Sequence, residues 1–263
     1  MIDQQTQQRI QKELDFIESE ENVRILYACE SGSRAWGFES KDSDFDVRFI
    51  YIRKPHWYLT IQKKRDVIER PIDNDLDISG WDLPKALELF RKSNPPILEW
   101  LQSPIIYRKV GSLSSRLRLL MDHYYSPISC KYHYLNMALN NHRQYLQGAT
   151  VNIKKYFYAL RPVLACLWIE QGLGVVPTEF TKLVNRHLIE GNLRFAVDNL
   201  LAKKANGHEM DHQPRIPEIS DFIGTQLSRL SADNEHASMT KDPGPLDELF
   251  AEILIETFGN SIK

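Results

Sequence analysis

The peptide SGSRAWGFESKDSDFDVRFI, residues 31–50, combines a Gly-Ser turn with closely spaced aspartates. The residues before it, VRILYACE (23–30), form a short apolar run that is rich in strand-forming residues. The segment FDVRFIYI (45–52) alternates in character and carries aromatic and β-branched residues, which is typical of a second strand. The Ser- and Gly-rich residues between the two runs indicate a turn or the start of a short helix. The sequence therefore predicts two strands joined by a tight connection, with acidic residues where the second strand begins.

Gly32, Ser33, Asp44 and Asp46 are the residues of this peptide that suit phosphate chemistry. A Gly-Ser turn that leaves a strand exposes backbone N–H groups and a hydroxyl to phosphate oxygens. Asp44 and Asp46 stand two residues apart, so both carboxylates project from one face of the strand. Two negative charges roughly 5 Å apart repel by about 3 kcal/mol at an effective dielectric of about 20. A shared divalent cation removes that cost, and carboxylate oxygens suit Mg²⁺ or Mn²⁺.

A third acid follows in LDISGW (76–81), a weaker strand candidate that is expected to pair in a hairpin with RDVIERPI (65–72). Asp77 is flanked by apolar residues, where a carboxylate is costly unless a neighbouring strand brings a cation to it. Two acids on one strand and a third on the next suit two metal ions roughly 3.5–4 Å apart, which serve in-line phosphoryl transfer. Asp75 lies two residues earlier on the same face and is the alternative third acid. The apolar-acid-apolar pattern favours Asp77.

The rest of the chain is predicted to be almost wholly helical. Apolar residues at helical spacing predict a leading helix over 3–20, and LPKALELFRKSN predicts another over 83–94. Pro and Gly residues separate the later helices, which are expected at 95–102, 112–125, 127–147, 152–171, 178–190, 192–205, 217–231 and 245–258. The polar segment 206–216 is predicted to be a loop. The expected fold class is α/β (α+β), with a small mixed β-sheet in an N-terminal head and an α-helical C-terminal domain.

Composition excludes several classes of protein. Of the 263 residues, 42% are hydrophobic and 26% are charged, so the chain has enough apolar surface for a sizeable core and is not disordered. No run approaches the roughly 18 apolar residues of a membrane span, and the N-terminus lacks the layout of a signal peptide. The cysteines, Cys29, Cys130 and Cys166, form neither a CxxC pair nor a disulfide framework. We therefore expect a cytoplasmic protein with no membrane partner.

Charge is unevenly distributed along the chain. The net charge is −2, but the segment Tyr107–Arg161 contains nine basic residues and one acid, so it carries +8 while the remainder carries −10. The same segment holds eight of the eleven tyrosines. A basic, Tyr-rich segment between acidic flanks indicates a face for phosphates or bases. The alternative interpretation is a solvated helical surface over a Tyr-rich core.

Several blocks of the sequence resemble one protein family. The Gly-Ser pair, the spacer and the strand that carries Asp44 and Asp46 resemble the signature of the DNA polymerase β-like nucleotidyltransferase superfamily. More narrowly, the chain resembles the predicted nucleotidyltransferases associated with RNA-repair operons, the RlaP family. That resemblance runs from about residue 23 to residue 185 and is carried by GSRAWGFESKDSDFDVRFIY, DLDISGWDLPKALELF, NPPILEWLQSPIIY and KKYFYALRPVLACLWI.

The resemblance implies a role for each residue that matches the catalytic motif. Gly32 and Ser33 would hold the β- and γ-phosphates of the nucleotide. Asp44 and Asp46 would bind two catalytic Mg²⁺ or Mn²⁺ ions. Asp77 would complete the metal site and help to deprotonate the attacking hydroxyl.

The resemblance also implies roles for basic residues around the motif. Arg34 and Arg48 are expected to bind nucleotide phosphates or the acids. Lys154, Lys155 and Arg161 are expected on the helical side of the site, and Lys155 is assigned to the nucleotide. Adjacent helical side chains point about 100° apart, so at most one of the two lysines aims directly at the site.

The implied enzyme is a nucleotidyltransferase of the EC 2.7.7 type with a catalytic head over residues 1–105 and a helical domain over 106–263. It would transfer a nucleoside monophosphate from ATP or another NTP to a hydroxyl, with release of pyrophosphate. RNA is the expected acceptor. The alternatives are a protein or small-molecule acceptor, as in an AMPylating or antitoxin-like enzyme, and a non-catalytic nucleotide-binding protein.

Overall fold

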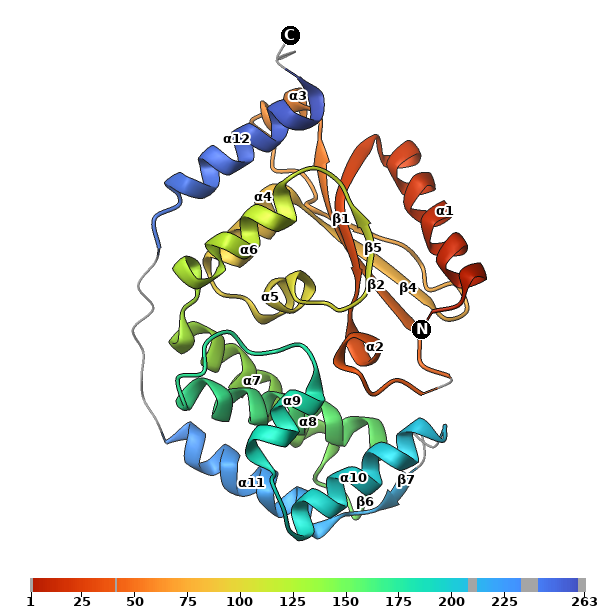
Figure 1. The fold of residues 1–263 in the computed structure, drawn as a ribbon, viewed down its shortest axis with the longest axis vertical. Coiled ribbons are helices and arrows are strands. Elements are labelled where there is room, and N and C mark those ends of the chain that lie inside the picture. The colour runs from red at the N-terminus through yellow and green to blue at the C-terminus, as the bar shows by residue number, and fades with distance from the viewer. Residues whose placement is uncertain (1, 41, 208–211, 233–240, 260–263) are drawn as a thin grey trace.

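The computed structural model of the chain describes residues 2–40, 42–207, 212–232 and 241–259. A mixed β-sheet with helices on both of its faces forms one half, and a group of helices beyond one end of the sheet forms the other (Figure 1). The expected α+β class, with a small mixed sheet and a helical C-terminal part, is confirmed. Within the described residues, no helix combines the length and apolar character that crossing a bilayer requires.

The sheet has five strands in the order β3-β4-β2-β1-β5. Strands β2 and β4 run parallel, and every other neighbouring pair runs antiparallel. The bounds are β1 (Val23–Glu30), β2 (Phe45–Arg53), β3 (Val67–Glu69), β4 (Leu76–Asp82) and β5 (Ile106–Lys109). The two strands of the opening peptide thus lie at the centre of the sheet, and the short helix α2 (Gly32–Trp36) lies in the connection between them.

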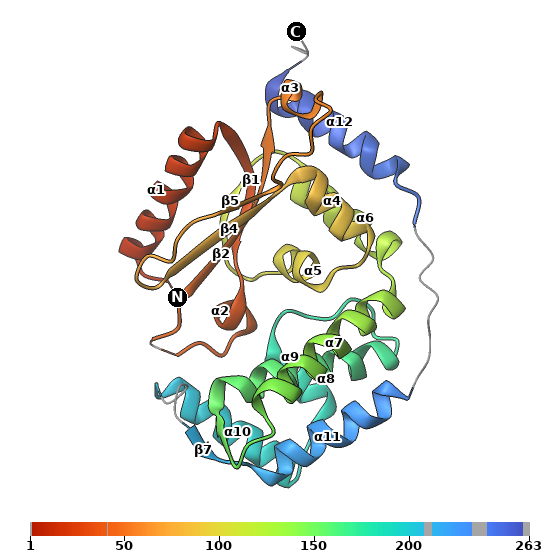
Figure 2. The same ribbon diagram turned by 180° about the vertical axis from the view of Figure 1, so that it is seen from behind.

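Helix α1 (Gln4–Glu21) covers one face of the sheet, and three further helices cover the other (Figure 2). Asp3 begins α1 by accepting a hydrogen bond from the Thr6 N–H at 2.9 Å. Ile10, Leu14 and Ile17 recur at helical spacing and are fully buried against the sheet. The opposite face packs on α4 (Leu83–Arg91), α5 (Pro95–Leu101) and α6 (Leu113–Tyr124).

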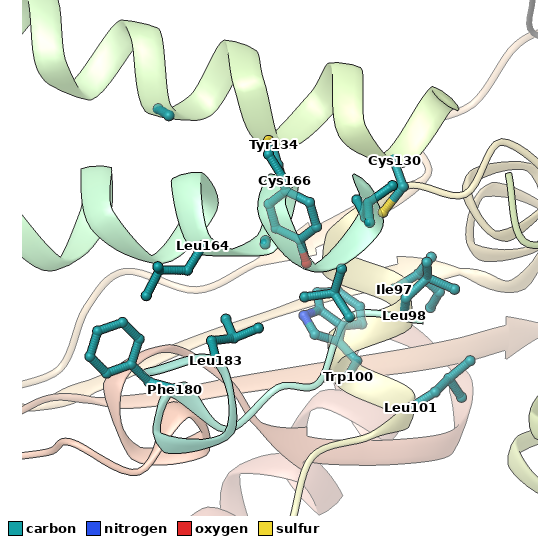
Figure 3. Close-up of a cluster of buried hydrophobic side chains, with 14 of the residues drawn as sticks. Ile97, Leu98, Trp100, Leu101, Cys130, Tyr134, Leu164, Cys166, Phe180 and Leu183 are labelled. Atoms are coloured by element: carbon teal, nitrogen blue, oxygen red, sulfur yellow. The ribbon is translucent and has the colours of Figure 1, made fainter. Parts of the chain in front are cut away.

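The helical half packs against the end of the sheet through α5. Its elements are α7 (Pro127–Tyr145), β6 (Thr150–Asn152), α8 (Ile153–Glu170), α9 (Phe180–His187), α10 (Asn192–Ala205), β7 (His212–Pro214) and α11 (Pro217–Ser231). Apolar side chains of α5, α7, α8 and α9 gather in one cluster around Tyr134, as Figure 3 shows. This cluster is continuous with the core beneath the sheet, so the two halves share one apolar core.

The last described helix, α12 (Gly244–Phe258), returns to the head and packs beside α4 and the short helix α3 (Pro55–Tyr58) (Figure 1). The Phe250 ring meets the Tyr58 ring edge-on, with centroids 5.1 Å apart. Glu256 accepts a hydrogen bond from the Ser112 N–H at 2.9 Å, at the start of α6. Helix α12 therefore packs on the head, although it follows the helical half in the sequence.

Most elements lie where the sequence predicts them, and the differences from the prediction concern mainly the short strands. Strand β5 was not predicted, and it extends the sheet past residue 105, where we expected the head to end. A boundary placed after Lys109 would keep the sheet whole, and the division into two domains stays a proposal. The loop expected at 206–216 includes β7, while residues 208–211 lie outside the described residues. The hairpin expected from 65–72 and 76–81 is confirmed as the β3–β4 pair.

A buried ion pair joins α5 to α8 within the shared core. The Arg161 guanidinium lies 2.8 Å from the Glu99 carboxylate, and only 1% of Arg161 is exposed. The same carboxylate accepts hydrogen bonds from the Tyr134 hydroxyl at 2.8 Å and from the Trp36 indole N–H at 3.0 Å. Arg161 also donates to the Thr178 carbonyl at 3.2 Å. The expectation that Arg161 lines the site was wrong, because its charge is used inside the core.

We expect Arg161→Met to lower the free energy of unfolding by about 3–5 kcal/mol, since it leaves the Glu99 carboxylate buried without its cation. Urea denaturation monitored by circular dichroism measures the loss. The double variant Glu99→Gln/Arg161→Met should lose less than Arg161→Met alone, because it leaves no isolated buried charge. A double variant as unstable as the sum of its single variants would contradict this assignment.

Candidate active site

Two of the predicted acids lie side by side on neighbouring strands. Asp46 of β2 and Asp77 of β4 are opposite one another in the parallel register. The residues that flank them, Val47 and Ile78 among them, pack on the α1 side of the sheet. Because side chains alternate along a strand, Asp46 and Asp77 project from the opposite face. The two carboxylates therefore lie next to each other on the face of the sheet that points away from α1.

Arg48 lies between the two carboxylates. Its Nη2 atom is 3.1 Å from Asp46 Oδ1 and 2.8 Å from Asp77 Oδ2. Its Nη1 atom donates to the carbonyls of Val47 and Asp77, both at 3.0 Å. The guanidinium is thus fixed by four contacts from two strands. Arg48 was expected to bind either nucleotide phosphates or the acids, and in the structure it binds the acids.

The Gly-Ser turn packs directly against Asp46. The Ser31 N–H donates to the Asp46 carbonyl at 2.8 Å. Gly32 has a φ of +58°, and a Cβ atom at this position would overlap the Asp46 carboxylate. Only glycine meets both requirements without strain. Within the described residues, the Ser33 hydroxyl makes no hydrogen bond and is half-buried, so it is available to a ligand.

Asp44 and Arg34 belong to the loop that leads into β2. Asp44 is exposed. Arg34 donates to the Ser43 carbonyl at 2.6 Å and to the Asp44 carbonyl at 3.2 Å, and its guanidinium lies 3.8 Å from the centroid of the Phe45 ring. The structure therefore shows Arg34 holding the loop that carries Asp44, and its expected contact with phosphate stays a prediction.

The structure places Asp75 and Asp77 differently. The Asp75 carboxylate lies 2.6 Å from Arg9 Nη1 of α1. Asp77 lies opposite Asp46 and shares Arg48 with it. Of the two candidate third acids, the structure thus brings Asp77, and not Asp75, to the side of Asp46.

Helix α8 faces the acids with a residue that sequence reasoning did not select. The Tyr158 ring meets the Trp36 ring of α2 edge-on, with centroids 6.0 Å apart. Burial raises the pKa of Tyr158 to about 12, and the charges of Asp46 and Asp44 add to this shift. The Lys155 ammonium lies near two rings, 4.0 Å from the centroid of Tyr145 and 5.4 Å from the centroid of Tyr158. The spacing of Tyr158 four residues after Lys154 was the signal that could have identified it.

The charges around Asp46 do not balance. Burial raises the pKa of Asp46, Asp77 and Asp44 raise it further, and Arg48 and Lys154 oppose the rise. Behind it, Glu30 is fully buried and accepts a hydrogen bond from the Asp46 N–H at 2.8 Å. Burial raises the pKa of Glu30 to about 7. An additional cation beside Asp46 would therefore be favourable.

The donor chemistry of the acids suits a divalent cation, although their arrangement is not that of a ready metal cluster. Carboxylate oxygens are the ligands that Mg²⁺ and Mn²⁺ prefer. Within the described residues, no group of three His, Cys, Asp or Glu side chains is placed to hold a metal ion. Asp46 and Asp77 fit such an ion by chemistry and proximity, and Arg48 supplies positive charge between them.

Comparison with known proteins assigns the chain to a class. Residues 6–252 match the model of the RNA repair pathway DNA polymerase beta family, RlaP. The chain belongs to this family, which supports a nucleotidyltransferase and confirms the resemblance seen in the sequence. The uncharacterized protein YcgL of Bacillus subtilis (strain 168) is 52% identical over 223 residues, which cover 85% of this chain and 86% of YcgL.

Among solved structures, a nucleotidyltransferase-like protein from Exiguobacterium sibiricum 255-15 is similar over 95% of this chain and 90% of its own. The identity is 11% and the TM-score is 0.31.

We expect Gly32→Ala to lower the free energy of unfolding by about 1–3 kcal/mol, because the new methyl group meets the Asp46 carboxylate and the backbone is left-handed. Gly172→Ala is the matched control: Gly172 has a φ of +67° and no atom within 4 Å of its added Cβ. Chemical denaturation of both variants separates backbone strain from the contact with Asp46. Equal losses of stability in the two variants would show that the added methyl group does not contact the Asp46 carboxylate.

We expect Arg48→Met to lower the free energy of unfolding by about 1–3 kcal/mol near neutral pH, where its carboxylate partners are charged. Removing Arg48 raises the pKa of Asp46 further above its ordinary value, so the penalty should be full above this raised pKa and should shrink as the pH falls through it towards the ordinary aspartate range and Asp46 takes up its proton. Urea titrations at about pH 7 and about pH 3.5 measure this trend. The control is Arg24→Met, which removes a 65% exposed cation. A loss of stability in Arg48→Met that is the same at both pH values would contradict the ion pairs between Arg48 and the two carboxylates.

Proposed function

We propose that the protein is a metal-dependent nucleotidyltransferase that moves a nucleoside monophosphate from an NTP to a hydroxyl acceptor. The observation that carries this proposal is the pairing of Asp46 and Asp77 on adjacent parallel strands, directly against the Gly32-Ser33 turn. Family membership supports the same reaction class. The two features together point to phosphoryl transfer. Paired acids can bind a cation, and the adjoining turn offers a hydroxyl and backbone N–H groups to phosphate.

In this reaction, the chain positions phosphate and acceptor for an in-line displacement. Ser33 and the backbone at Gly32 would bind the β- and γ-phosphates. Asp44, Asp46 and Asp77 would hold Mg²⁺ or Mn²⁺, which when bound neutralises phosphate charge and makes the acceptor hydroxyl more acidic. Asp77 would accept the hydroxyl proton as the acceptor oxygen bonds to the α-phosphorus. The bond from that phosphorus to the bridging oxygen breaks, and pyrophosphate leaves.

We propose RNA as the acceptor, and two features support it. The description of the family includes RNA repair. In the basic, Tyr-rich segment, the rings of Tyr132 and Tyr145 are 57% and 43% exposed on α7, where they can stack on unpaired bases. Lys155 lies over the Tyr145 ring and adds a charge for the nucleic-acid backbone. Other tyrosines of the segment, such as Tyr134 and Tyr156, are buried. These tyrosines belong to the core and are not available to RNA.

We also propose that the protein works in the cytoplasm. Cys29, Cys130 and Cys166 are all buried free thiols in the structure, which is compatible with a reducing compartment. Burial raises the pKa of each thiol, so these cysteines are small apolar packing residues rather than nucleophiles.

We expect Asp46→Ala and Asp44→Ala to reduce nucleotidyl transfer by at least about 100-fold, as the loss of a group that stabilises transition-state charge does. The first measurement is titration calorimetry of ATP, CTP, GTP and UTP with Mg²⁺ on the wild type and both variants. Asp75→Ala is the control, because this acid pairs with Arg9. Circular dichroism checks that each variant folds. Normal turnover in Asp46→Ala would refute the proposed site.

The acceptor is tested by following radiolabel from an α-labelled NTP. We expect the label on RNA, because Tyr145 is 43% exposed and has the Lys155 ammonium over its ring, so the pair can bind a base and the nucleic-acid backbone. Reactions with purified RNA, with a protein extract freed of RNA, and with a small-molecule fraction are compared on denaturing gels. Label that appears on protein or on a small alcohol would overturn the RNA assignment while leaving the reaction class in place.

A further inference from the structure

A buried glutamate lies behind Asp46, on the other side of the sheet. Glu30 is the last residue of β1, and its side chain is fully buried. Its cross-strand neighbour on β2 is Val47, and opposite residues of an antiparallel pair share one face of the sheet. Val47 packs on the α1 side, so the Glu30 carboxylate lies on that side as well. The sheet therefore separates Glu30 from the face on which the Asp46 carboxylate would meet a metal ion.

The Glu30 carboxylate takes the place of a main-chain partner at the start of β2. Its Oε1 atom accepts a hydrogen bond from the Asp46 N–H at 2.8 Å. The Asp46 carbonyl accepts one from the Ser31 N–H, also at 2.8 Å. Beyond Glu30, the main chain leaves the sheet to form the Gly-Ser turn, so the glutamate side chain completes the pairing. Both backbone polar groups of Asp46 are thereby held.

Tyr107 of β5 holds the other oxygen of the same carboxylate. Its hydroxyl donates to Glu30 Oε2. The register between β1 and β5 shifts between Ala28 and Cys29, which leaves Tyr107 without a partner residue on β1. A bulge of this kind bends the strand and re-aims a side chain. Here the Tyr107 ring lies in the apolar cluster on the α1 side, where its hydroxyl reaches Glu30.

A glutamate suits this position because both of its partners are donors. A carboxylate accepts hydrogen bonds through two oxygens, and the Asp46 N–H and the Tyr107 hydroxyl occupy one oxygen each. An apolar residue in place of Glu30 would leave two buried donors unpaired, which is costly. The two hydrogen bonds thus connect β5 to the start of β2 through one buried side chain.

The contact between Asp46 and the Gly-Ser turn makes the position of the Asp46 backbone critical. A Cβ atom on Gly32 would overlap the Asp46 carboxylate, so the turn and this side chain already lie as close as a glycine allows. A small displacement of the Asp46 backbone would change both the direction of its carboxylate and its fit to the turn. Groups that orient a metal ligand are often worth as much to metal affinity as a ligand is, although they do not touch the metal.

We propose that Glu30 and Tyr107 form a positioning pair that fixes Asp46 for a divalent cation, an inference that rests on the proposed function. Glu30 acts through its hydrogen bond to the Asp46 N–H, and Tyr107 fixes the orientation of Glu30. Neither residue touches the substrate or the metal. The pair supplies hydrogen bonds rather than charge, so Glu30→Gln should work: its amide oxygen accepts from Asp46, and its NH₂ group can donate to the Tyr107 oxygen.

Hydrogen exchange of the Asp46 amide, followed by NMR in the metal-free protein, tests the hydrogen bond itself. We expect about 10-fold faster exchange in Glu30→Ala and about 3-fold faster exchange in Tyr107→Phe, because the amide loses its acceptor or the acceptor loses its support. Glu30→Gln should stay within about 2-fold of the wild type, since it keeps an acceptor oxygen. Tyr51→Phe is the matched control, because it removes a buried hydroxyl elsewhere on β2 and should leave the Asp46 amide unchanged.

Calorimetry with Mn²⁺ alone, on the same variants, tests the consequence for the site. We expect Glu30→Ala to weaken Mn²⁺ binding about 10-fold or more, as the loss of a group that orients a ligand does, and Glu30→Gln to stay within about 3-fold of the wild type. Thermal melting shows whether each variant folds. Tyr107→Phe carries the test if Glu30→Ala does not fold.

The results separate the positioning pair from the proposed function. Wild-type exchange of the Asp46 amide or wild-type Mn²⁺ affinity in Glu30→Ala would overturn the pair, and so would an equal loss in Glu30→Gln and Glu30→Ala. A protein that shows every expected change but transfers no nucleotide would support the pair and refute the nucleotidyltransferase. A protein that transfers nucleotide, while Glu30→Ala keeps normal exchange and affinity, would overturn the pair and keep the enzyme.

Discussion

The Glu99 carboxylate is the point at which the two halves of the molecule are held in register. It accepts hydrogen bonds from Arg161 of α8, Tyr134 of α7 and Trp36 of α2. Because Trp36 ends the helix that starts with the Gly-Ser turn, this one side chain fixes the turn relative to α8. Buried ion pairs often contribute little net stability compared with apolar packing, and we infer that this one serves to specify a single arrangement of the two halves. Here the specified arrangement sets Tyr158 of α8 against Trp36 of α2, near the acids.

The elements of the site with local sequence signals were predictable. The β1–turn–β2 unit follows from apolar and alternating runs, and Asp46 and Asp77 follow from acids at strand positions, whereas Asp44 lies in the loop just before β2. The structure confirms that Asp46 and Asp77 meet, because a parallel register sets them opposite each other. Whether Arg48 would bind phosphates or carboxylates could not be read from the sequence, since an arginine suits both.

The elements that were missed depend on partners far away in the chain. Strand β5 has four residues, and its pairing with β1 joins positions such as Tyr27 and Lys109. Arg161 was expected at the site because of the resemblance to the family. Its partner Glu99 comes 62 residues earlier, and neither residue signals the other. Periodicity reports which face of an element is buried, but it does not report what that face will meet.

The return of α12 to the head affects how the protein reaches its native state. Leu246, Leu249 and Ile253 are buried in the common core beside α4, yet they are synthesised after the whole sheet and after α7–α11. Domains generally fold as units from the N-terminus during translation. In this chain, the apolar surface that α12 covers must stay open to solvent or to a chaperone until the ribosome has delivered that helix. The nascent head therefore keeps an uncovered apolar surface from the completion of the sheet until α12 has been made, and α12 then covers that surface.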